Sequence, residues 1–227
     1  MNQPNQIPPD DLTELPLFPL NLVLFPGMRL PLHIFEERYK AMIGDCIDRE
    51  TPFGVVLIKE GPEVGGPAEP FRIGTSARVT QVQRLEEGRM NLLALGERRF
   101  DLVEIVQEEP HMVGRIAYKE EAVGELDSQV LSDVGQEYGV FLQHIATLAG
   151  AWNAPVEVPE NPLNLSFEAV STLTGSIELP QGMRQDLLEV ETASERLSQL
   201  LPLLKRANEL ISEQVDKNNP YRGPRLN

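Results

Sequence analysis

Residues 15–32 read LPLFPLNLVLFPGMRLPL. Apolar residues alternate in the manner of strands on both sides of Phe25-Pro26-Gly27, but each half contains prolines, which cannot donate to a β-ladder. We therefore expect two edge or barrel-rim strands, at 15–20 and 28–34. They should be joined by a turn in which Gly27 is free to adopt a positive φ.

The hydrophobic period changes directly after these strands. From Phe35 to Arg49 apolar residues recur at spacings of three and four, which predicts one amphipathic helix packed on the sheet and ended by Thr51-Pro52. Glu86-Glu87-Gly88 is the expected hairpin turn. Further strands are expected at 53–58, 71–84, 90–95, 100–106 and 113–118. Because several of them carry apolar residues on both faces, the sheet should be closed or covered.

After residue 121 the apolar spacing becomes helical. A long helix ending at Gly150 is expected, followed by helices over 167–173, 181–188 and 193–215, with Pro202 kinking or splitting the last. The predicted fold class is α+β, with about six strands and one packed helix followed by a C-terminal helical bundle. The predicted division is a disordered lead-in (1–12), a barrel (13–121), a helical part (122–216) and a flexible tail (217–227).

Composition narrows the classes of function. The formal net charge is -15, and so acidic a surface repels phosphate backbones and anionic lipid, which argues against nucleic acid and membrane as partners. The single cysteine, Cys46, cannot form an internal disulfide, and the first residues have no apolar signal-peptide core. The cytoplasm is the expected location, and no stretch is apolar for long enough to span a bilayer.

Catalytic motifs are missing from the sequence. Gly74-Thr75-Ser76-Ala77-Arg78 lacks the second glycine of a nucleophile elbow, and no Gly-Lys pair could end a phosphate-binding loop. The three histidines, His33, His111 and His144, lie far apart without metal-ligand spacing. Cys46 sits on the apolar stripe of the first helix between acidic neighbours, which predicts a buried structural thiol. We expect no enzyme, catalytic residue, cofactor or metal.

The apolar residues of 15–32 are the remaining candidate for function. They crowd a proline-rich segment that cannot be a central strand throughout, so some of them are expected to face solvent. Exposed apolar patches on a soluble protein usually mark binding surfaces, and each buried anchor contributes roughly 1.5 to 3 kcal/mol. The alternative is that these residues simply fill the barrel.

The same stretch resembles the opening of the Lon protease amino-terminal domain, which reads L-P-L-x-P-L, then F-P-G, then L-P-L. Residues 34–39 (IFEERY) resemble the form seen in stand-alone Lon-domain proteins and, more loosely, in cereblon. Residues 72–77 (RIGTSA) and 95–100 (LGERRF) are similar to inner strand motifs of the same domain. The resemblance is strongest over about residues 15–118. It implies a PUA-like pseudo-barrel followed by helices, and a role in recognising unfolded, damaged or targeted polypeptides. Lon's ATPase and peptidase have no counterpart here, so protease activity is not implied.

The resemblance supplies no compact set of binding residues. Their position beside the Pro-Gly turn and a strand edge nominates five contacts for a polypeptide: Phe18, Phe25, Met28, His33 and Phe35. Strand addition there would use backbone hydrogen bonds for affinity. The expected partners are unfolded or apolar segments, with a protease or another protein left open and the oligomeric state unknown. The alternatives are a scaffold for one folded partner, or a PUA-like module for a small molecule or RNA.

Overall fold

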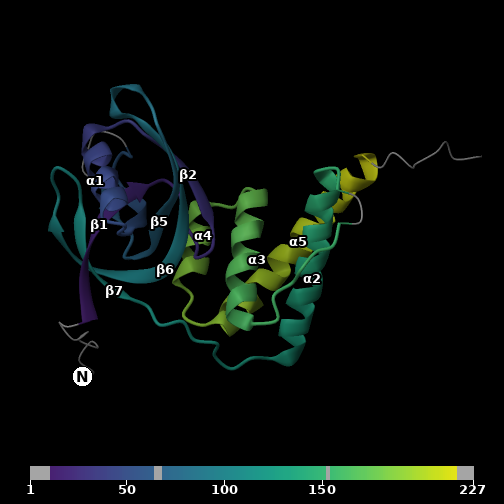
Figure 1. The fold of residues 1–227 in the computed structure, drawn as a ribbon. Helices are drawn as coiled ribbons and strands as arrows, with labels where there is room; N and C mark the ends of the chain where they lie inside the picture. The colour runs from purple at the N-terminus through teal and green to yellow at the C-terminus, as the bar shows by residue number, and fades with distance from the viewer. Residues whose placement is uncertain (1–10, 64–67, 152–153, 219–227) are drawn as a thin grey trace, which may run out of the picture. The chain divides into compact units, whose positions relative to one another are not determined.

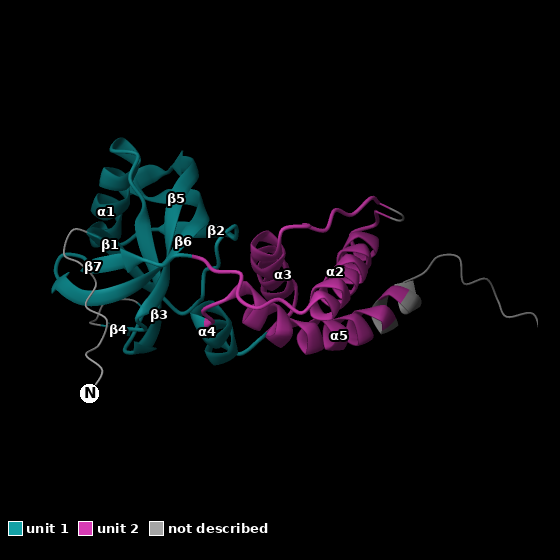
Figure 2. Ribbon diagram, turned by 90° about the horizontal axis from the view of Figure 1, so that it is seen from below, with its two compact units in different colours: residues 1–120, 179–189 teal, residues 121–178, 190–227 magenta. Residues whose placement is uncertain are grey.

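The computed structural model of the protein describes residues 11–63, 68–151 and 154–218 (Figure 1). Its internal contacts divide the chain into two units, coloured teal and magenta in Figure 2. The first comprises residues 1–120 and 179–189, and the second comprises residues 121–178 and 190–227. The predicted lead-in and tail mostly lie outside the described residues. Leu12 already belongs to a strand, and residues 217–218 to a helix.

The first unit is a closed sheet. Its strands are β1 (Leu12–Leu20), β2 (Arg29–Ile34), β3 (Phe53–Glu60), β4 (Glu69–Pro70), β5 (Ile73–Arg84), β6 (Met90–Gln107) and β7 (Val113–Tyr118). The antiparallel path β1-β7-β6-β5-β3 returns to β1 through a parallel β1–β3 pairing, so five strands form a ring. β2 pairs with β6, and the two-residue β4 pairs with β3. The expected α+β class and the closed sheet are confirmed.

The prolines of β1 fall where each half of the strand has a neighbour on one side only. Leu12 to Pro16 pair with β7, and Leu17 to Leu20 pair with β3. The change of partner is marked by the Leu17 N–H, which donates to the carbonyl of Met112 at 2.8 Å. A strand with one unpaired edge tolerates proline. The proline-rich segment therefore forms the seam at which the barrel closes.

β6 differs from the expectation of two strands, because it runs without a break through Gly96. A Cβ at Gly96 would lie 2.4 Å from the carbonyl oxygen of Phe25, so only glycine lets the 25–27 turn approach so closely. The Gly27 N–H donates to Gly96 O at 2.8 Å, and the Gly96 N–H donates to Met28 O at 2.9 Å. The glycine between the two apolar runs thus marks a close approach of the turn and not a strand end.

Helix α1 (Glu37–Asp48) closes one side of the barrel, two residues shorter at its start than predicted. Its buried face carries Tyr39, Met42, Ile43 and Cys46, which join a core with residues of β1, β3 and β6. The predicted burial of Cys46 is confirmed. The predicted turn also holds, since Glu86–Gly88 form a short 3-10 helix, η2, between β5 and β6.

Helix α4 (Gln181–Glu189) differs from the sequence-based division, which placed it in the helical part. It belongs to the first unit, and two of its groups form hydrogen bonds with strand residues. The amide of Gln185 donates to the carbonyl oxygen of Ile73 at 3.0 Å. The fully buried guanidinium of Arg99 donates to the carbonyl oxygen of Leu188 at 2.5 Å.

The second unit consists of α2 (Ser128–Leu148), α3 (Pro162–Ser176) and α5 (Ala193–Asn218). The α3 helix starts before the predicted residue 167, because Asn161 caps it and Pro162 occupies its first turn. α5 continues through Pro202 and is not split there. Asn208 of α5 donates to Glu137 of α2, at 2.8 Å to the carboxylate. None of the described helices is both long and apolar enough to cross a membrane.

Candidate functional site

Two of the five residues expected to contact a polypeptide are buried, and the expectation that they face solvent is wrong. Phe25 is 0% exposed and Phe18 is 7% exposed. Phe25 lies in the turn whose close approach is possible because residue 96 is glycine. Phe18 belongs to the main core of the barrel. Alternation in a proline-rich strand does not show which face another element will cover, and here α1 covers Phe18.

The other three lie at or near the surface. Phe35 is 50% exposed, and its ring stacks on that of His33 with centroids 5.9 Å apart. The Nδ1 of His33 is 2.7 Å from the side-chain oxygen of Asn91 on β6. Met28 is partly buried against the core. A role in binding for Met28, His33 and Phe35 stays a prediction.

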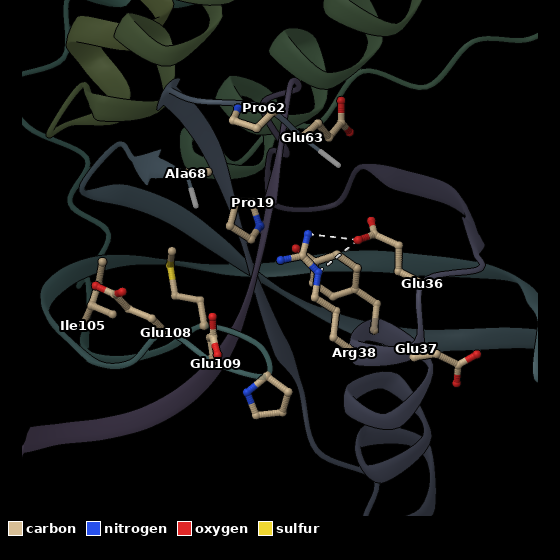
Figure 3. A pocket seen from close by; sticks show the side chains of 13 residues that line it. Pro19, Glu36, Glu37, Arg38, Pro62, Glu63, Ala68, Ile105, Glu108 and Glu109 are labelled. Atoms are coloured by element: carbon tan, nitrogen blue, oxygen red, sulfur yellow. Dashed lines mark hydrogen bonds and ion pairs between the residues drawn. The ribbon is translucent and has the colours of Figure 1, made fainter. Parts of the chain in front are cut away.

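A groove with a volume of about 770 Å³ opens beside the start of α1. It is bounded by β1, the first turn of α1, the segment after β3 and the turn between β6 and β7. Figure 3 shows Pro19 near its centre, with Glu36 and Arg38 on one side and Ile105, Glu108 and Glu109 on the other. Its lining residues are Pro19, Glu36, Glu37, Arg38, Tyr39, Pro62, Glu63, Ala68, Ile105, Glu108, Glu109, Pro110 and Met112.

Neighbouring side chains fix the position of Tyr39, one of the residues that line the groove. Phe18 stacks on Tyr39 with ring centroids 4.1 Å apart, and the guanidinium of Arg38 lies 4.5 Å above the Tyr39 ring. Burial raises the pKa of the Tyr39 hydroxyl, against a smaller opposing effect of Arg38. Ile105, which is 38% exposed, and Met112 add apolar surface from the opposite wall. The groove therefore offers a client apolar surface mainly from Ile105 and Met112, beside a nearly buried Tyr39.

Carboxylates dominate the rim. On the α1 side they are paired: Glu36 accepts from Arg38 Nε at 3.0 Å, and Glu37 lies 2.5 Å from Lys40. The Arg38 Nη2 is 3.0 Å from Glu36 and buried, but not aligned for a hydrogen bond. On the opposite wall, Glu108 and Glu109 are exposed and have no ion pair within the described part of the chain. The groove carries uncompensated negative charge on that wall.

The residue-level predictions missed this groove. Its α1 wall lies in the IFEERY motif, whose Glu36, Arg38 and Tyr39 were not nominated as contacts, and neither were Glu108 and Glu109 on the opposite wall. The sequence did show an acidic pair and Met112 just before β7. Because β7 pairs with β1, these residues could have been expected near the segment that follows β1 in the chain. Only the ring closure of the barrel brings these segments to one place.

The described residues contain no group of three or more histidine, cysteine, aspartate or glutamate side chains that could hold a metal ion. Ser76 is buried and donates to the carbonyl oxygen of Arg98, so its hydroxyl is engaged in the sheet. Burial raises the pKa of the Cys46 thiol, which disfavours the reactive thiolate. Burial lowers the pKa of His111, whose buried Nδ1 has no hydrogen-bond partner among the residues that the structure describes.

Comparison with known proteins agrees with the resemblance of the sequence motifs. The family model described as the ATP-dependent protease La (LON) substrate-binding domain matches residues 14–206. A Lon protease of Anaeromyxobacter dehalogenans is 31% identical over an alignment of 215 residues, which covers 89% of this chain and 24% of that protein. Lon protease 2 of Myxococcus xanthus is 28% identical over 95% of this chain and 27% of its own length. The chain thus spans about a quarter of these relatives.

Two solved structures share the fold. The Lon N-terminal domain protein from Xanthomonas campestris aligns with a TM-score of 0.62 at 27% identity, over 84% of this chain and 98% of its own. The N-terminal domain of a Mycobacterium avium complex Lon protease also has a TM-score of 0.62, at 18% identity, and covers 85% of this chain. The second likeness concerns the fold alone.

Proposed function

Because the chain belongs to the family of Lon (protease La) substrate-binding domains, we propose that it binds segments of other polypeptides without cutting them, in the groove beside the start of α1. The matched family model describes a substrate-binding domain and includes neither an ATPase nor a peptidase domain. The bound client would be handed to a separate protease or to another quality-control protein. The cytoplasm is the proposed compartment, since the single cysteine requires no oxidising environment.

The observation that carries the proposal is an open groove with a supported apolar lining. Tyr39 is fixed between Phe18 and Arg38, while Ile105 and Met112 leave apolar surface to be covered. A volume of about 770 Å³ lies in the range of pockets that enclose ligands. Covering partly exposed apolar side chains supplies affinity without requiring one fixed sequence, which suits unfolded clients.

Strand addition to β6 is less favoured than side-chain capture. β5 pairs with one edge of β6 only as far as Asp101. Past that residue, this edge of β6 has no strand partner among the described residues. However, the β6–β7 register shifts twice, between Leu102 and Glu104 and between Ile105 and Gln107. Such bulges bend an edge and interrupt a regular ladder. We therefore propose that side chains provide most of the contact.

Binding of unfolded protein is the direct test. Titration with reduced casein and screening on a peptide array should both give binding by the wild-type protein. Ile105→Ser should weaken casein binding by about five- to tenfold, because an apolar anchor in the groove is lost. Val82→Ser is the matched control, since Val82 is 40% exposed on β5 but does not line the groove.

The outcomes separate the candidate functions. If neither casein nor any arrayed peptide binds, polypeptide capture is wrong. Equal weakening by Ile105→Ser and Val82→Ser would remove the groove as the site. A single stoichiometric folded partner in a pull-down, with no binding of unfolded protein, would replace capture with a scaffold role. RNA is disfavoured by the net charge of -15.

A further inference from the structure

The distribution of charge around the groove indicates which kind of polypeptide segment binds there. Resting on the proposed function, we infer that the groove selects polypeptide segments in which lysine or arginine stands beside apolar side chains. Apolar lining alone would accept any apolar segment, so the selection must come from the rim. The rim carries five glutamates, Glu36, Glu37, Glu63, Glu108 and Glu109, and one arginine, Arg38.

The α1 side of the rim cannot provide this selection. Glu36 is paired with Arg38 and Glu37 with Lys40, at 3.0 Å and 2.5 Å. Both glutamates also lie at the start of α1, where the partial positive charge of the helix N-terminus offsets them. A cation arriving there would have to compete with partners already in place.

The opposite wall carries negative charge that no cation among the described residues neutralises. Glu108 and Glu109 follow the last residue of β6, are exposed, and have no cationic partner among the residues that the structure describes. Glu63 accepts a hydrogen bond from the neutral amide of Asn21 at 2.9 Å, which leaves its charge in place. These three glutamates line the same groove as Tyr39 and Ile105. A lysine or arginine stem could cover the apolar lining while its charged head meets Glu108 or Glu109.

This arrangement argues for one kind of occupant over others. An acidic segment would bring like charge towards unpaired carboxylates, which is repulsive. A second copy of this chain, with net charge -15, is a poor occupant for the same reason. A cationic and apolar segment gains both from covering the lining and from charge complementarity.

Peptide selectivity tests the inference. Three labelled peptides of equal length share their leucine and phenylalanine positions, and their remaining positions are all lysine, all glutamine or all glutamate. Fluorescence anisotropy with the wild-type chain should rank lysine tightest and glutamate weakest, with a lysine affinity that falls as salt rises. Glu108→Gln combined with Glu109→Gln should weaken the lysine peptide by about fivefold and leave the glutamine peptide unchanged.

The matched control removes the same charge elsewhere. Glu86→Gln with Glu87→Gln alters an adjacent glutamate pair in the other hairpin turn, outside the groove, and should change lysine-peptide affinity by less than about twofold. Equal weakening by the two double variants would reduce the preference to overall charge and overturn the inference. Equal affinity for the lysine and glutamine peptides would overturn it while leaving polypeptide capture standing. Self-association abolished by the Glu108 and Glu109 changes would make a second copy the occupant, which also overturns it.

Discussion

Phe18 and Tyr39 stack with their ring centroids 4.1 Å apart, and only Tyr39 lines the groove. Phe18 therefore acts on the binding surface from inside the core. Phe18→Leu should lower the free energy of unfolding by about 1 kcal/mol, because the aromatic stacking is lost while apolar volume is largely kept. It should also weaken casein binding, since Tyr39 loses its support. Urea unfolding and casein titration check both effects, and weakened binding at unchanged stability would instead place Phe18 in contact with the client.

The contact between Gln185 and Ile73 holds α4 on the strands. Gln185→Leu would leave the Ile73 carbonyl oxygen buried without its donor, so stability should fall by about 1 to 3 kcal/mol. Amide hydrogens of α4 should exchange faster, as hydrogen-exchange mass spectrometry can show. Asp186→Asn, at an exposed position of the same helix, is the control. Unchanged exchange in α4 would show that this hydrogen bond does not hold the helix.

His111 should make stability depend on pH. Burial lowers its pKa in the folded chain below the ordinary value of 6.5, so the unfolded chain takes up the proton first. The stabilising contribution is complete above pH 6.5 and is lost progressively as the pH falls through 6.5 to the lowered folded value. His111→Gln should flatten this part of the curve of unfolding free energy against pH. Carboxylates contribute equally to both proteins, so identical curves would contradict the assignment.

Cys46 should be protected from thiol reagents in the native protein. It is 4% exposed, and burial raises its pKa, so both access and the thiolate fraction are reduced. Reaction with a chromogenic disulfide at pH 8 should be at least about tenfold slower in buffer than in denaturant. Comparable rates in the two conditions would contradict its place on the buried face of α1.

Periodicity was sufficient for most elements but not for their partners. Alternation predicted the strands and the three-four spacing predicted α1, because a buried face must repeat with the element's own period. The same spacing in α4 says that one face is covered but not by what, and Gln185 finds a carbonyl far away in the chain. Phe25 is buried because Gly96 admits its turn, and that approach depends on tertiary structure. The groove escaped prediction for the same reason, since ring closure brings Glu36–Tyr39 opposite Glu108–Met112.

Site-specific photocrosslinking can show whether an unfolded polypeptide lies in the groove. A photoreactive phenylalanine analogue at position 105, in the groove, or at position 82, outside it, would be irradiated in the presence of reduced casein. We expect crosslinked casein from position 105 and little from position 82, with the position 105 product competed away by the lysine-rich apolar peptide. Crosslinking from position 82 alone, or equally from both positions, would contradict the groove as the site of polypeptide binding.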